Sequence, residues 1–157
     1  IIELKTFNRS KDKSDWHEGF GLNFKITDLQ ASLGISQFNK LEIFSKNKVS
    51  NHKIYMNNVS NKNVQVLPFK DKEVPWFFDI KLKTIKYKNQ LQQILLEKGI
   101  ETRNFYPALS KQKYLKKYSN ENLEYSEKVF DKLLWLPSSN NLSKSDIINI
   151  SKTINAS

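Results

Sequence analysis

The stretch GLNFKITDLQASLG, residues 21–34, carries the most informative local pattern of the chain. Its first glycine permits backbone angles that other residues avoid. Asn23 and Lys25 lie two residues apart, so an extended segment points both side chains to the same side. Thr27 and Gln30 have the spacing of a capping box, which predicts a helix starting after Thr27. An amide donor, an ammonium group and a helix N-terminus together suit an anion such as a phosphate, although a plain loop before a helix explains the same residues.

The residues on either side of this stretch predict an arm and a helix. Residues 1–26 are polar and irregular, and we expect them to form a loop or arm that belongs to a larger domain. Residues 27–60 are expected to form one long connecting helix, which Gly34 interrupts at a cost of about 1 kcal/mol relative to alanine. A glycine inside a helix is typical of close approach by another backbone. The apolar positions that follow a near-helical period are Leu29, Leu33, Phe38, Leu41, Phe44 and Val49.

Residues 61–157 are expected to form a small α+β domain. Strands are predicted over 64–67, 75–83, 100–103 and 134–137, and helices over 87–95, 111–118, 123–134 and from Ser143 onward. Gly99 is expected to end the helix over 87–95, and Ser143, with Asp146 three residues later, to cap the last helix. In the strand over 75–83, Phe78, Ile80 and Leu82 should share one face. This order of elements predicts a small antiparallel or mixed sheet covered by helices.

Composition excludes several classes of protein. The chain is 38% hydrophobic and 12% aromatic, enough for a packed core, and it has no cysteine for disulfides or thiolate metal sites. Its two histidines, His17 and His52, leave little for a metal cluster, and we expect His52 to be solvated on a lysine-rich helix face. No apolar run approaches the roughly 20 residues of a membrane span, and no signal peptide is visible. The first residue is not methionine, so we expect a trimmed or incomplete cytoplasmic protein.

The net charge of +10 raises the question of a nucleic-acid partner. The lysines are scattered along the chain, so we expect a solvated basic surface, or one that attracts a small anion, rather than a dedicated nucleic-acid site. No nucleophile elbow, phosphate loop, dinucleotide fingerprint or zinc spacing is present. Arg103 could hold a carboxylate or phosphate through its planar guanidinium, although a structural ion pair is the slightly favoured explanation.

Four motifs resemble those of one known family. GLNFKITDLQASLGISQFNKL resembles the G-x-N-x-R-[ML]-[ST]-x-[LI]-Q-A-A-x-G-x-x-Q-L segment of the DegT/DnrJ/EryC1/StrS family, the pyridoxal 5'-phosphate (PLP)-dependent sugar aminotransferases. VPWFFDIKL, LLEKGIETRNFYPALS and LLWLPSSNNLSKSDI resemble three further family motifs, and all four occur in family order from about Ile1 to Ile154. The forms PWF and TRNFYPAL are most similar to the perosamine-synthetase-like branch, which aminates position 4 of a nucleotide-linked keto-deoxysugar.

The resemblance implies the C-terminal small domain of a fold-type I PLP aminotransferase. It implies that Asn23, with Lys25 beside it, reaches the cofactor phosphate of the neighbouring subunit in a homodimer. Arg103 and Tyr106 are the residues expected to contact the substrate. Lys25 replaces the arginine usual in the family, and Ser110 replaces a histidine, which puts one substrate contact in doubt.

The resemblance also implies an absence. The family's Schiff-base lysine, and the aspartate that pairs with the pyridine nitrogen, would lie upstream of Ile1, so the chain alone is not expected to transaminate. The intact enzyme would transfer an amino group from glutamate to the keto-sugar nucleotide. Two alternatives stay open: a stand-alone, non-catalytic small domain that binds a partner protein or a nucleotide sugar, and a basic nucleic-acid-binding module.

Overall fold

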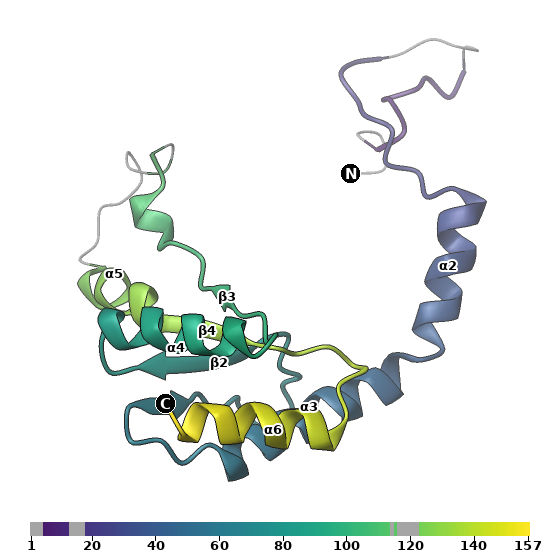
Figure 1. Cartoon of the computed structure of the whole chain (residues 1–157). Coiled ribbons are helices and arrows are strands. Elements are labelled where there is room, and N and C mark those ends of the chain that lie inside the picture. Colours follow the sequence, from purple (N-terminus) through teal and green to yellow (C-terminus); the bar gives the residue numbers. More distant parts are fainter. Residues whose placement is uncertain (1–4, 13–17, 114, 116–122) are drawn as a thin grey trace. The chain divides into compact units, whose positions relative to one another are not determined.

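The computed structural model describes residues 5–12, 18–113, 115 and 123–157. The chain divides into two compact units, Ile1–Glu42 and Ile43–Ser157. Figure 1 shows the elements of both units along the chain. None of the helices that the structure describes is long and apolar enough to span a bilayer.

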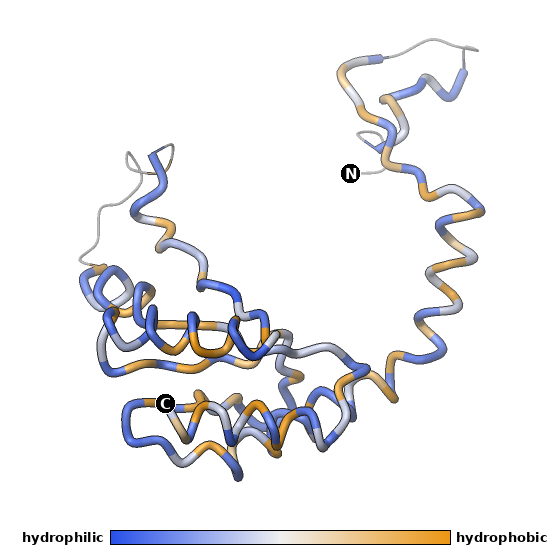
Figure 2. The backbone as a smooth tube through the Cα atoms, viewed as in Figure 1, coloured by the Kyte–Doolittle hydropathy of each residue, from blue (hydrophilic) through white to orange (hydrophobic). Residues whose placement is uncertain are grey.

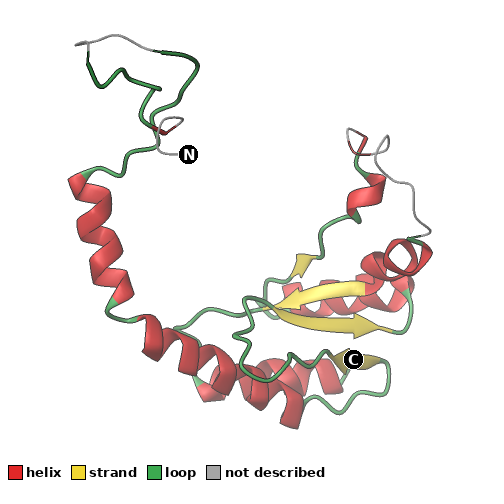
Figure 3. Cartoon of the chain, turned by 180° about the vertical axis from the view of Figure 1, so that it is seen from behind, coloured by secondary structure: helices red, strands yellow, loops and turns green. Residues whose placement is uncertain are grey.

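The prediction of a single helix over residues 27–60 is wrong. This span contains two helices (Figure 3): α2, Asp28–Phe38, and α3, Leu41–Asn58. The predicted capping box at the start of α2 is confirmed. The break comes at Asn39 and Lys40, where the Lys40 amide donates to the Gln37 carbonyl at 3.0 Å in a tight turn. Asparagine favours turns over helix interiors because its short amide competes for backbone hydrogen bonds.

The helix α2 buries none of its residues. Figure 2 shows apolar residues recurring along it, and four of them are more than half exposed: Leu29, Leu33, Ile35 and Phe38. Gly34 has open space around it, with no described atom within 4 Å of an added Cβ. The close backbone approach predicted at this glycine is therefore not made by any described part of the chain.

The second unit contains a four-stranded antiparallel sheet with the strand order β1-β2-β4-β3. Antiparallel pairing was one of the two arrangements predicted. In the register of the central pair, Ile80 lies opposite Leu134. The strands are β1, Val64–Val66; β2, Phe78–Leu82; β3, Arg103–Asn104; and β4, Leu133–Leu136.

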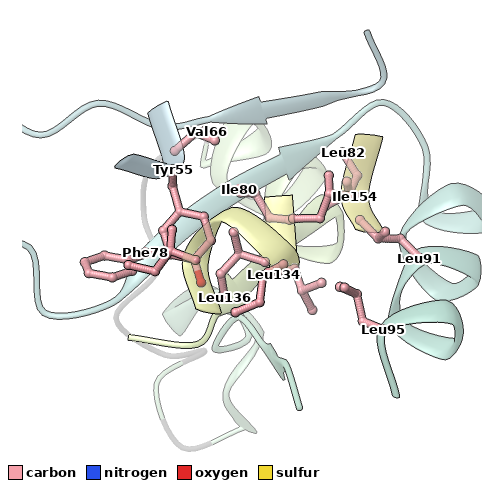
Figure 4. Packing of buried hydrophobic residues seen from close by; sticks show 12 residues of the cluster. Tyr55, Val66, Phe78, Ile80, Leu82, Leu91, Leu95, Leu134, Leu136 and Ile154 are labelled. Carbon is pink, nitrogen blue, oxygen red and sulfur yellow. The ribbon is translucent and has the colours of Figure 1, made fainter. Parts of the chain in front are cut away.

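The core lies between one face of this sheet and the helices α3, α4 (Ile85–Glu97) and α6 (Lys144–Asn155). The predicted alternation in β2 is confirmed, since Phe78, Ile80 and Leu82 are all buried. Figure 4 shows these side chains packing against residues of the three helices. The other cluster members include Tyr55, Leu91, Leu95, Leu134, Leu136, Ile147, Ile150 and Ile154.

Local signals fix the ends of two of these helices. Gly99 follows α4 with φ 73°, as predicted for a glycine that ends a helix, because this left-handed conformation favours glycine. Ser143 and Asp146 form the predicted capping box of α6. Acceptance of two hydrogen bonds from Ser143 lowers the pKa of the Asp146 carboxyl.

The segment between β3 and β4 differs in part from the prediction. The helix expected over 123–134 is α5, Glu124–Val129, followed by a short 3-10 turn, Phe130–Lys132. The last two residues of the predicted helix, Leu133 and Leu134, belong instead to β4. The helix predicted over 111–118 lies largely outside the described residues, and a 3-10 turn occupies Leu109–Lys111.

Candidate functional site

The arm before α2 folds back on itself through backbone pairing. Thr6 and Asn23 form an isolated antiparallel bridge. Beside it, the amide of Phe7 donates to the carbonyl of Leu22 at 3.2 Å. This pairing fixes the backbone at Asn23, one of the two residues expected to contact the cofactor phosphate.

Gly21 is needed for this pairing because of the space around it. A Cβ at this position would lie 2.4 Å from the Asn8 nitrogen and 2.4 Å from the carbonyl carbon of Phe7. Both contacts are with backbone atoms that cannot swing away as a side chain could. Phe7 and Asn8 themselves adopt left-handed angles, φ 60° and 49°, at the turn that brings them there. The glycine thus allows two backbone segments to touch, whereas the sequence had suggested unusual backbone angles as its role; Gly21 is not among the glycines with positive φ.

The side chain of Asn23 is exposed and partly committed. Its Oδ1 accepts a hydrogen bond from the Lys25 amide at 3.3 Å. The NH₂ group of the same side chain can still donate to a ligand. Lys25 is also exposed. An amide donor beside an ammonium group suits an anion, and the cofactor contact of these two residues stays a prediction.

The second group of predicted residues meets in space on the other unit. The guanidinium of Arg103, on β3, lies 5.4 Å from the ring centre of Tyr106 and 5.6 Å from that of Trp135. Tyr106 is 56% exposed, and Arg103 is exposed as well. Arg103 forms no ion pair with any described residue. Among the described residues, the structural ion pair that the sequence left open is therefore not formed. A guanidinium held over two rings keeps its five N–H donors for an incoming anion.

Trp135 is the platform of this cluster, and the sequence did not single it out. It is only 4% exposed, and it stacks on Phe77 with ring centres 4.1 Å apart. Tyr106 meets it edge to face at 4.8 Å, and Phe105 lies 5.1 Å from it. In the sheet register Trp135 is paired with Arg103 itself. Only that register could have revealed the residue, because β3 and β4 are about thirty positions apart in the sequence.

Two lysines hold the backbone around the cluster. Lys88, 8% exposed on α4, donates to the side-chain carbonyl of Asn104 at 3.1 Å and so ties β3 to the helix. Lys48, on α3, donates to the carbonyls of Trp76 and Ser138. Burial lowers the pKa of Lys48. Both ammonium groups therefore fasten the segments that carry the aromatic side chains.

Ser110, where the family motif has histidine, has a partner within the chain. Its hydroxyl donates to the Glu127 carboxylate at 2.6 Å. Both are partly buried, and this bond joins the segment after Tyr106 to α5. The serine thus has a contact of its own in this chain.

The expectation that His52 is solvated is wrong. The residue is only 2% exposed, because the loop after β1 covers it, and its Nε2 lies 2.9 Å from the Leu67 carbonyl. Burial lowers the pKa of His52, partly offset by that hydrogen bond and by the nearby charge of Asp79. Burial raises the pKa of Asp79, partly offset by a hydrogen bond from the Trp135 side chain and by His52. The sequence pattern of α3 gave no sign of this, since lysines surround the histidine.

Residues 1–155 match the sequence profile of the DegT/DnrJ/EryC1/StrS aminotransferase family. The chain belongs to this family. It is 31% identical, over 144 residues, to a GDP-perosamine synthase of Escherichia coli O157:H7, and the match covers 89% of the chain and 38% of that protein. The family is PLP-dependent.

Solved structures show the same fold. The Helicobacter pylori aminotransferase PseC, involved in the biosynthesis of pseudoaminic acid, is 20% identical and superposes with a TM-score of 0.84 over 98% of the chain and 43% of its own length. A Streptococcus pneumoniae protein solved in its PLP form is 17% identical, with a TM-score of 0.85 over 99% of the chain and 41% of its own length. The chain therefore spans about two fifths of the length of these aminotransferases.

Proposed function

We propose that this chain is the C-terminal part of a PLP-dependent aminotransferase that moves an amino group from glutamate to a nucleotide-linked keto-deoxysugar. The observation that carries the proposal is the exposed Arg103 guanidinium, held over Tyr106 and Trp135 in a chain that belongs to this family. The likeness to a GDP-perosamine synthase favours a GDP-linked sugar.

In this proposal Arg103 and Tyr106 bind the anionic substrate. The guanidinium offers a planar set of donors that matches the two oxygens of a phosphate or carboxylate. Its position over two rings limits its rotation, so less conformational freedom is lost on binding. The phenolic hydroxyl of Tyr106 adds a neutral donor or acceptor next to it.

The arm serves the cofactor rather than the substrate. When bound, PLP supplies the electron-withdrawing ring on which amino transfer depends. The described residues fit its phosphate end, because Asn23 presents an N–H donor and Lys25 an ammonium group on an exposed, backbone-paired segment. We propose that they hold the phosphate bound in the neighbouring subunit of a homodimer.

The exposed apolar residues of α2 support a partner surface beyond this chain. No residue of that helix is buried, although four of its large apolar side chains are more than half exposed. Monomeric proteins rarely leave such a surface uncovered. We propose that the remaining part of the enzyme, which also supplies the lysine that holds the cofactor, covers it.

The test compares the chain with the longer protein that contains it. The longer protein should aminate a GDP-linked keto-deoxysugar with glutamate, followed by mass spectrometry of the product. Arg103→Ala should raise KM for the sugar nucleotide by about tenfold or more, the usual size of a charged hydrogen bond. Arg103→Lys keeps the charge but loses the planar guanidinium, so its KM should lie between those of the wild type and Arg103→Ala. Lys86 is an exposed cation on α4, and Lys86→Ala should leave KM unchanged.

The cofactor role has its own readout. Asn23→Ala should release PLP faster during dialysis, measured by its visible absorbance, without changing the KM for the sugar. The chain alone should retain no PLP after borohydride reduction; a reduced adduct on one of its lysines would overturn the division of labour proposed here.

If the longer protein is active and Arg103→Ala leaves its KM unchanged, Arg103 and Tyr106 do not bind the substrate. A chain found to be complete by itself, binding a nucleotide sugar without amino transfer, would establish the non-catalytic alternative.

A further inference from the structure

A small pocket opens beside the Trp135 platform, within the unit 43–157. Its volume is about 350 Å³, at the lower end for small-molecule sites. Three polar side chains and several aromatic rings line it, among them His52, Phe69, Glu73, Phe77, Asp79 and Trp135. Its side-chain charge is negative, in a chain whose net charge is +10.

His52 gives this pocket a buried hydrogen-bond acceptor. Because a carbonyl oxygen can only accept, the contact with Leu67 O fixes the proton of the ring on Nε2. The Nδ1 atom of the neutral ring then carries a lone pair, and it has no hydrogen-bond partner among the described residues. Nearly all buried polar atoms in proteins are hydrogen-bonded, so this acceptor, in a pocket-lining side chain only 2% exposed, is an exception whose partner the described residues do not supply.

The two carboxylates of the pocket are also acceptors. Asp79, half-buried on β2, accepts from the Trp135 side chain. Glu73 accepts from the Lys70 amide at 3.0 Å through one of its oxygens. Neither forms an ion pair with a described residue. The two carboxylates can therefore accept hydrogen bonds from N–H or O–H donors of a ligand, and their negative charge favours a cation.

The walls suit a cation with an apolar body. Phe77 stacks on Trp135, and Trp76 stacks on Phe77 with ring centres 5.9 Å apart and planes 16° apart. Phe69 meets the His52 ring edge to face at 4.8 Å. The electron-rich faces of aromatic rings attract cations and cover hydrocarbon equally well.

We propose that this pocket binds an organic cation with N–H donors, a primary ammonium or guanidinium group on a short apolar chain. A bare metal ion fits it poorly, because the described residues contain no group of three His, Cys, Asp or Glu side chains placed to hold one. The assignment does not depend on the aminotransferase proposal, since it uses only side chains of this unit.

The test is a titration of the full 157-residue chain with butylammonium, followed by the indole N–H resonance of Trp135 in a two-dimensional NMR spectrum. That proton is the one donated toward Asp79, so occupation of the pocket should shift it. Saturable binding is expected near millimolar Kd, the range open to so small a ligand. Tetramethylammonium, which has charge but no N–H, and butanol, which has no charge, should each bind at least about tenfold more weakly.

Variants assign the binding to the pocket. Asp79→Asn should weaken butylammonium about tenfold or more, and Glu73→Gln, on an exposed loop where folding is not at risk, should weaken it severalfold. Glu97→Gln, an exposed carboxylate on α4, is the matched control and should change nothing. The proposal is overturned if no saturable shift occurs, if tetramethylammonium or butanol binds as well, or if Glu73→Gln and Asp79→Asn both leave the affinity unchanged.

Discussion

Acid should weaken the fold of this chain through one buried histidine. His52 is 2% exposed, and burial lowers its pKa from the usual 6.5, which favours the neutral ring in the folded state. In the unfolded chain the same ring takes up a proton with the ordinary pKa. Below that value the unfolded state binds more protons than the folded state, so the free energy of unfolding falls as the pH falls. Above it both states are neutral, and the contribution is fully present.

The size of the effect has an upper limit set by one proton. A shift of one pKa unit corresponds to about 1.4 kcal/mol, so acidification from pH 7.5 to 5.5 removes at most roughly 1.4 kcal/mol through His52. The limit is reached if the folded ring stays neutral throughout. Asp79 acts in the opposite sense, because its raised pKa means that protonation relieves a buried charge. Its window lies between its raised pKa in the folded state and its ordinary pKa of 3.8, and the stability that protonation restores is fully present below 3.8.

Urea unfolding at pH 7.5 and 5.5, followed by circular dichroism, measures the difference. His52→Gln replaces the ring with a side chain that does not titrate and whose amide can still donate to the Leu67 carbonyl. The loss of stability on acidification should shrink in this variant, by at most the roughly 1.4 kcal/mol set by one proton. An equal loss in the wild type and in His52→Gln would refute the assignment of a buried, neutral ring.

Four further substitutions test packing and caps. Gly21→Ala should abolish the backbone pairing of the arm, seen as faster amide exchange there, whereas Gly34→Ala, in open space, should stabilise its helix by up to about 1 kcal/mol. Tyr55→Phe removes the donor to a backbone carbonyl at 3.1 Å and should cost about 1 kcal/mol in urea unfolding, with Tyr125→Phe, 74% exposed, as the unaffected control. Ser143→Ala removes the cap of α6 and should cost about 1 kcal/mol, which an unchanged unfolding midpoint would contradict.

The elements that the sequence predicted well are those with local causes. Both capping boxes, the glycine after α4 and the alternation of β2 depend on residues within a few positions of one another. The break after α2 also has a local cause, but one turn-favouring asparagine in an otherwise helical pattern is a weak signal. The apolar pattern continued through it, so the pattern alone predicted one helix.

The site was predictable only where a motif marked it. Arg103 and Tyr106 lie three positions apart in one motif, and the structure brings them together. Trp135 joins them through the pairing of β3 with β4, and His52 is buried by a loop fifteen positions later. Contacts of this kind depend on register and on loop paths, which no local pattern of this chain encodes.

On the sheet face away from the core, two opposite charges, Arg103 and Asp79, each interact with Trp135. The Arg103 guanidinium lies over the ring of Trp135, and the Asp79 carboxylate accepts from the side chain of the same residue. A direct pair between the two would neutralise both and leave neither for a ligand. Held instead on a buried indole that is 4% exposed, each keeps its charge available, and the rotation of that one side chain is restricted by three further rings. The same packing that stabilises β4 thereby holds a guanidinium and a carboxylate on one indole without pairing them.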